Sequence, residues 1–173
     1  YQGIYLIGEN IKRDVGRVDI ATLNPLENSG DEMTGGYIFK SDLANSGNSW
    51  TSNYSPIDHP DFEVDFVYHY PKQDDITTQQ KDYLASFVDS METRLYAPSY
   101  ADETDGFRSM MDELSFIDYF IVNELSRNND GFKKSRYYHK DKNSNGGKLH
   151  AGPTWDFDWG WKNLNACDIF SQI

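Results

Sequence analysis

The sequence predicts an α+β domain in which strands come first, two amphipathic helices follow, and a β-hairpin comes near the end. Three observations lead to this prediction. Residues 62–68 alternate apolar with polar side chains, as a half-buried strand does. Two stretches between residues 77 and 127 carry apolar residues at helical spacing. Asn145-Gly146, a strong hairpin-turn pair, lies between two short strand-like runs.

The first seventy residues are expected to form strands joined by polar connections. Residues 3–7 predict a buried strand because they are a short apolar run, and the charged stretch 11–20 predicts a ribbon or a turn. Residues 24–36 form a loop by composition, and its two final glycines lead into a short strand at 37–40. Residues 41–60 are rich in Ser, Asn, Gly and Asp, and they predict a long surface loop.

Both helices carry start signals. Thr77 with Gln80 three residues later forms a capping box, and Ser115 with Asp118 repeats that spacing before the second helix. The second helix is expected to end in the turn-forming residues 127–131. The apolar stripe of the first helix consists of Leu84, Phe87, Val88, Met91 and Leu95. The face that the second helix is expected to bury consists of Ile117, Phe120, Ile121 and Leu125.

Composition limits the possible partners. The formal net charge of −12 argues against a nucleic-acid partner and against a polybasic membrane-surface protein. No apolar run approaches the 18 or so residues that a transmembrane helix needs, so we expect no transmembrane segment. The acidic balance does not exclude ATP, because a local lysine and a metal ion can offset a distant negative surface.

Two groups of acids have the layout of a phosphoryl-transfer site. Asp130 directly follows the second helix, and the hairpin then returns the chain to Asp156 and Asp158. In such sites one acid orients the attacking hydroxyl, and a second holds the magnesium that bridges the nucleotide phosphates. Other interpretations stay open here. Asp130 alone also suits a helix-terminating turn, and the two later acids also suit structural bonds to the backbone.

Further polar groups are candidates for binding. Lys40 ends a short strand, where it can contact nucleotide phosphates or simply face solvent. Residues 141–146 match the opening of a calcium loop, but the twelfth position is Gly152 and the same residue types form hairpin turns, so both interpretations are kept. His139 and His150 lie on the two strands of the hairpin and are expected to be neighbours on its surface.

These residues resemble the CotH family, atypical protein kinases of the spore-coat protein H type. The similarity extends over nearly the whole chain, and its last block is the most specific one. The matching pieces are residues 1–6 with Glu9, residues 36–40, 128–130, 137–138 and 152–158.

The resemblance implies a two-lobed, kinase-like fold, here truncated at both ends. Residues 1–173 would form one domain, with a strand-rich nucleotide part at about 1–70 and a helical part with the catalytic hairpin at 71–173. It also implies binding of ATP and Mg²⁺ and phosphorylation of Ser or Thr in a protein substrate. A secreted or cell-surface location in a bacterium fits the same resemblance.

The resemblance also assigns roles to individual residues. Lys40 would contact the phosphates, and Glu9 would orient Lys40 or line the lobe. Asp130 would be the catalytic-loop acid. Asp156 would hold the metal, with Asp158 as a second candidate. Ser135 stands where a kinase catalytic loop carries a metal-binding Asn, and a hydroxyl is a weaker magnesium ligand than an amide oxygen.

An alternative function is a non-catalytic cell-surface module that binds a protein or a glycan on a kinase-like scaffold. The aromatic content of 15% and the acidic surface would suit such a partner. A cleft that holds Lys40, Asp130 and Asp156 together would support the enzyme, whereas scattered positions would support the module.

Overall fold

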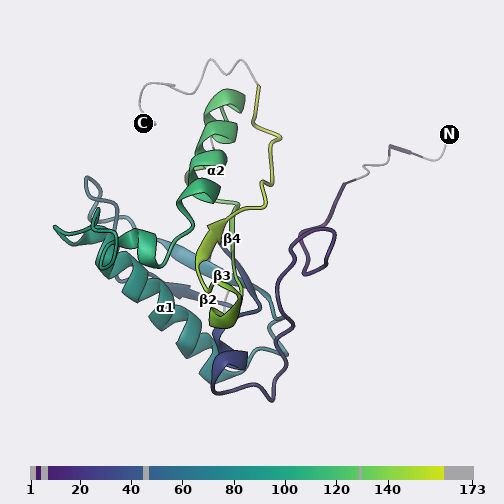
Figure 1. The fold of residues 1–173 in the computed structure, drawn as a ribbon. Helices are drawn as coiled ribbons and strands as arrows, with labels where there is room; N and C mark the ends of the chain where they lie inside the picture. Colours follow the sequence, from purple (N-terminus) through teal and green to yellow (C-terminus); the bar gives the residue numbers. More distant parts are fainter. Residues whose placement is uncertain (1–2, 5–7, 45–46, 129, 162–173) are drawn as a thin grey trace.

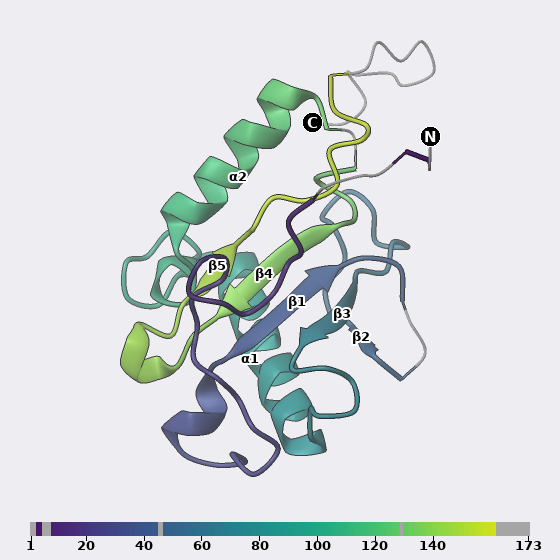
Figure 2. The same cartoon turned by 90° about the vertical axis from the view of Figure 1, so that its right-hand side faces the viewer.

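A computed structural model describes residues 3–4, 8–44, 47–128 and 130–161. Within these ranges the strands are β1 (Tyr37–Ser41), β2 (Ser49–Thr51), β3 (Asp65–Tyr70), β4 (Arg136–Lys140) and β5 (Leu149–Ala151). The helices are α1 (Thr78–Tyr96) and α2 (Glu113–Ser126), with 3-10 turns η1 (Asp31–Thr34), η2 (Phe107–Ser109) and η3 (Asn143–Asn145). The described strands form one five-stranded sheet in the order β2-β3-β1-β4-β5, antiparallel throughout (Figures 1 and 2).

Strand β1 lies at the centre of the sheet and separates two cores. It pairs with β3 on one side and with β4 on the other. Because successive side chains point to opposite faces, Tyr37 and Phe39 pack with α1, whereas Ile38 packs with Ile11 and Tyr137 on the other face. In Figure 2 the N-terminal segment crosses in front of the sheet and α1 lies behind it. The chain is therefore layered as helix, sheet and N-terminal segment.

Helix α1 forms as the sequence predicts. Thr77 is its N-cap, and the reciprocal capping-box bonds with Gln80 are both present. Leu84, Val88 and Met91 are buried against the sheet. The predicted stripe is confirmed except at its end, where Leu95 is exposed.

Helix α2 corrects two expectations. Its N-cap is Asp112, which accepts a hydrogen bond from the Ser115 N–H, so Ser115 is the third residue of the helix rather than its cap. Its buried residues are the polar Asn123 and Ser126. The four residues expected to be buried are exposed: Ile117, Phe120, Ile121 and Leu125. The helix extends beyond the sheet (Figure 1), and Phe132 contacts this face with its ring centre 5.6 Å from that of Phe120.

Three strand boundaries also differ from expectation. Residues 41–60 are not all loop, because β2 lies within them and adds an edge strand to β3. Strand β3 starts at Asp65, and Phe62 is more than half exposed although it continues the alternating pattern. Gly3 and Ile4 are not in a strand, and Ile4 is 88% exposed. The rest of that expected strand, residues 5–7, lies outside the described residues.

Lys140 joins three segments from inside the protein. Its side chain is fully buried, and its ammonium donates hydrogen bonds to Thr34 O at 2.5 Å and to Asn143 Oδ1 at 3.1 Å. The Nζ atom also lies 4.6 Å from the centre of the Phe87 ring. Burial lowers the pKa of Lys140 to about 8. This lysine therefore fixes the turn before β1 to the hairpin turn and to α1.

The predicted hairpin is confirmed. Strands β4 and β5 pair antiparallel around η3, and His139 lies opposite His150 with the two rings stacked at 5.1 Å. His139 also bonds the Gly152 carbonyl at 3.1 Å. Burial lowers the pKa of His139, the Gly152 bond and the charges of Asp141 and Asp112 oppose that shift, and the neighbouring His150 adds to it.

The α1 cap is expected to contribute measurably to stability. Thr77→Ala removes the side-chain acceptor for Gln80 N and the bond to Asn28, so we expect a loss of about 1–2 kcal/mol in the free energy of unfolding. Urea denaturation measures this loss. Ser86→Ala, in the exposed middle of α1, is the control and should change stability by less than about 0.5 kcal/mol. Equal effects from the two substitutions would contradict the cap assignment.

Stability is also expected to fall in mild acid. The pKa of His139 is lower in the folded chain than its ordinary 6.5, so the unfolded chain binds the extra proton first as pH falls. The free energy of unfolding should therefore decrease between about pH 7 and pH 5. His139→Gln should make this decrease smaller, as measured by denaturation at several pH values. An unchanged slope in that variant would show that another group causes the acid sensitivity.

Candidate functional site

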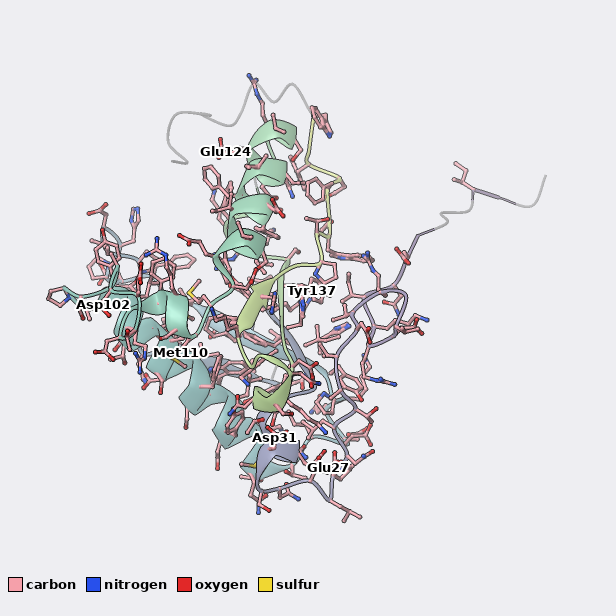
Figure 3. All side chains as sticks on the ribbon, in the orientation of Figure 1. Glu27, Asp31, Asp102, Met110, Glu124 and Tyr137 are labelled. Atoms are coloured by element: carbon pink, nitrogen blue, oxygen red, sulfur yellow. The ribbon has the colours of Figure 1, made fainter. Side chains whose placement is uncertain are left out.

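Tyr137 is the centre of the candidate site. Its ring is buried on the side of β4 that faces the N-terminal segment (Figure 3). Lys40 lies opposite it across the β1–β4 ladder, with Nζ 5.8 Å from the ring centre. The same Nζ contacts Asp42 Oδ2 at 2.5 Å. Lys40 and Asp42 are two residues apart on extended chain, so both side chains lie on the same face of the sheet.

The charge of Asp156 acts on the same tyrosine. Burial raises the pKa of the Tyr137 hydroxyl; the positive charge of Lys40 opposes this shift, and Asp42 and Asp156 reinforce it. Trp155, next to Asp156, contacts the Tyr137 ring edge to face at 6.4 Å. A cation and two carboxylates thus surround one ring, although they come from chain segments more than a hundred residues apart.

Asp156 and Ser135 share a strained arrangement. Both have positive φ, 64° for Asp156 and 55° for Ser135, a conformation that residues other than glycine seldom adopt. The Ser135 hydroxyl donates to Asp156 Oδ2 at 3.0 Å. Strain of this kind costs of the order of 1–3 kcal/mol per residue and concentrates at functional sites. Ser135 stands where a kinase catalytic loop carries a metal-binding Asn, and this hydrogen bond joins it to Asp156, the residue expected to bind the metal.

The Asp130 loop is connected to Asp156 through one buried amide. Helix α2 ends at Arg127 in the left-handed conformation, and the chain turns at once. Asn128 is buried, accepts the Gly131 N–H at its carbonyl oxygen, and donates from Nδ2 to the Asp156 carbonyl at 3.4 Å. Asp130 itself is mostly buried and contacts Lys134 through Oδ2 at 3.2 Å. The two acid-bearing loops are therefore neighbours.

Two other candidates lie apart from this group. Glu9 is exposed and contacts Arg17 Nη1 at 3.3 Å, while the cation that it was expected to orient, Lys40, is paired with Asp42. Asp158 is exposed in the turn that follows Phe157. Lys40, Ser135 and Asp156 are thus gathered around Tyr137, Asp130 is joined to them through Asn128, and Glu9 and Asp158 are outside the cluster.

The oxygen donors fit a magnesium ion held largely by a nucleotide. Mg²⁺ is usually bound by one or two carboxylates together with substrate phosphates and water. The exposed Asp156 carboxylate and the Ser135 hydroxyl offer such a set. Among the described residues no group of three or more His, Cys, Asp or Glu side chains could enclose a metal.

The calcium-like stretch forms a turn. Asp141 Oδ1 accepts the backbone N–H groups of Ala21 and Lys142, and its Oδ2 accepts the Asn145 amide. Both carboxylate oxygens are therefore used inside the protein, as expected for a hairpin turn.

Sequence reasoning missed the two residues that organise the cluster, Asp42 and Asn128. The signal for Asp42 was its spacing of two from a strand lysine, which places both on one face. No sequence signal marks Asn128 as buried, because turn-forming residues after a helix are usually exposed.

One family model, described as CotH kinase protein, matches residues 1–171. No curated protein and no solved structure matches the chain. Among the described residues no helix is both long enough and apolar enough to cross a membrane.

The loop that carries Asp130 has no room at Gly131. A Cβ atom there would overlap Asn123 Oδ1, so Gly131→Ala should force the loop away from α2 and cost about 1–3 kcal/mol of unfolding free energy. Urea denaturation measures this cost. The control is Gly8→Ala, since nothing lies within 4 Å of a Cβ at that position. A Gly131→Ala protein as stable as the control would mean that the loop is loosely held.

Proposed function

Because this chain belongs to the CotH kinase protein family, we propose that it transfers the γ-phosphoryl group of ATP to Ser or Thr of a protein substrate. The observation that supports this most is the set of charges around Tyr137. Lys40, beside the Tyr137 ring, supplies a cation for phosphate oxygens, and Asp156, whose neighbour Trp155 contacts the same ring, supplies a carboxylate for a metal. Phosphoryl transfer needs these two functions close together.

Lys40 is the phosphate-binding residue in this proposal. Its ammonium is held by Asp42 at the end of β1, so it is already directed toward the Tyr137 side of the sheet. A pre-positioned cation loses little freedom when it binds, which strengthens its contact with an anionic ligand. Asp42 takes the orienting role that was one of the two possibilities for Glu9, the other being to line the lobe.

Asp156 and Ser135 would hold the metal. When bound, Mg²⁺ neutralises charge on the β- and γ-phosphates. The Ser135 hydroxyl already fixes one oxygen of the Asp156 carboxylate, and the positive φ of both residues sets the direction of their side chains. Asn128 Nδ2 donates a hydrogen bond to the backbone carbonyl of Asp156 and so helps to fix the backbone there.

Asp130 would place the acceptor. Its carboxylate would accept a hydrogen bond from the Ser or Thr hydroxyl and so direct the hydroxyl oxygen at the phosphorus atom. Lys134, which contacts the same carboxylate, holds it in place. Catalysis then depends mainly on positioning and on neutralisation of charge.

The wider proposal follows the family. We propose a two-lobed, kinase-like domain with a nucleotide part at about 1–70 and a helical part from 71 onward, acting at the surface of a bacterium or after secretion. In the described residues the hairpin of the second part joins the sheet of the first through the β1–β4 ladder. Such pairing would make the two parts move as one.

A non-catalytic binding module is the second candidate, and one observation favours it. Helix α2 exposes a continuous apolar face that includes Ile117, Phe120 and Ile121. Contiguous exposed apolar faces commonly contact another protein. This function would require no nucleotide.

Calorimetry with ATP, in the presence and absence of Mg²⁺, tests the proposed function. Magnesium-dependent binding is expected, and Asp156→Ala should weaken it by at least about tenfold because a metal ligand is lost. Asp130→Ala should keep that binding while phosphoryl transfer, followed with radiolabelled ATP and a protein acceptor, drops by about a hundredfold or more.

The matched control is Asp58→Ala, which removes an exposed acid from a surface turn. It should leave both binding and transfer unchanged. Full activity in both Asp130→Ala and Asp156→Ala would disprove the assignment of roles, and the absence of any nucleotide binding would favour the binding module.

A further inference from the structure

The opposite face of the sheet contains a cavity. About 740 Å³ of space lies between the sheet, the second half of α1 and the chain around residues 54–64. Its walls include Phe39, Phe66 and Tyr138, which point toward α1 and away from Lys40. The cavity is thus separated from the proposed phosphoryl-transfer site by the thickness of the sheet. Cavities of about 300–1,000 Å³ are typical of sites for small molecules.

The lining is mostly aromatic and aliphatic, with a small number of charged groups. Arg136 and Lys133 bring two cations to the wall, from the start of β4 and the loop before it. In a chain with a net charge of −12, two cations on an apolar cavity are unexpected. Apolar walls with a few convergent polar groups are the usual composition of a ligand site.

Arg136 is positioned in this wall by a neighbouring strand. Its Nη2 donates to Ser41 Oγ at 3.0 Å, and its Nε is buried without a hydrogen-bond partner among the described residues. The buried Nε is closed to a ligand, but the rest of the side chain lines the cavity. The positive charge of the guanidinium can therefore pair with an anionic oxygen in the cavity.

The other titratable groups of the lining do not compete for this guanidinium. Glu92 accepts a hydrogen bond from Ser52 Oγ at 2.8 Å, and burial raises the pKa of its carboxyl. His59 is exposed. The local balance therefore favours a ligand with negative charge.

We propose that this cavity binds a small amphipathic anion, an organic oxyacid with one negative charge on an apolar or aromatic body. The acid group would pair with the Arg136 guanidinium, with Lys133 nearby, and the body would lie against Phe39, Phe66 and Tyr138. A planar carboxylate or a sulfonate matches the N–H donors of a guanidinium. This site is independent of nucleotide binding.

Fluorescence titration with 8-anilinonaphthalene-1-sulfonate tests the proposal. This probe has the required aromatic body and single negative charge. Saturable binding is expected, and laurate should displace the probe at lower concentration than the uncharged 1-dodecanol. Arg136→Gln should weaken binding by about tenfold or more, because a charge-assisted hydrogen bond is lost. Val64→Trp should abolish binding by filling the cavity, which Val64 lines.

Two control variants separate this site from other surfaces that could attract the probe. Lys72→Gln removes an exposed cation elsewhere, and Leu125→Ser reduces the apolar face of α2. Both should bind the probe as the unmodified chain does. Equal binding by the unmodified chain, Arg136→Gln and Val64→Trp would overturn the proposal, as would loss of binding in Leu125→Ser or equal displacement by laurate and dodecanol.

Discussion

The pairing of β1 with strands on both sides is the constraint on which the structure depends. Because β1 is central, its side chains pack into a core on each face of the sheet, and their alternation along the strand determines which core each residue joins. Phe39 completes the core under α1, and Lys40, the next residue, emerges beside Tyr137. A shift of one residue in register would exchange these roles and place a lysine in the aromatic core.

The two faces of this sheet have different chemistry. On one face, charges from β1 and from the chain after the hairpin act on a tyrosine, and Ser135 and Asp156, both with positive φ, are joined by a hydrogen bond. On the other, aromatic side chains leave a space that two cations border. Strand β4 contributes to both faces, with Tyr137 on one and Arg136 and Tyr138 on the other. A single five-residue strand therefore links the two sites covalently while their side chains remain apart.

Local sequence patterns predicted much of the fold and part of the site. The α1 cap, the hairpin and the short strand β1 depend on neighbouring residues, so spacing alone was sufficient to predict them. The orientation of α2 was not predictable in this way. Its apolar stripe at Ile117, Phe120 and Ile121 indicates a face to be covered but says nothing about what covers it.

The same limit applies to the site. The order of Asp130, the hairpin and Asp156 predicted two adjacent acid-bearing loops, whereas the contact of Lys40 with Tyr137 and the bond from the buried Asn128 to Asp156 join distant segments. The hairpin turn shows how contacts with a distant segment can fix the length of a loop. Although it is rich in Asn and Gly, it is bonded to η1 through Lys140. Ser144 also bonds Asp31, and Lys142 pairs with Glu32. Its length is therefore fixed by the segment against which it rests, so a peptide tag would be better accommodated in the exposed connection at residues 99–105 than in this glycine-rich turn.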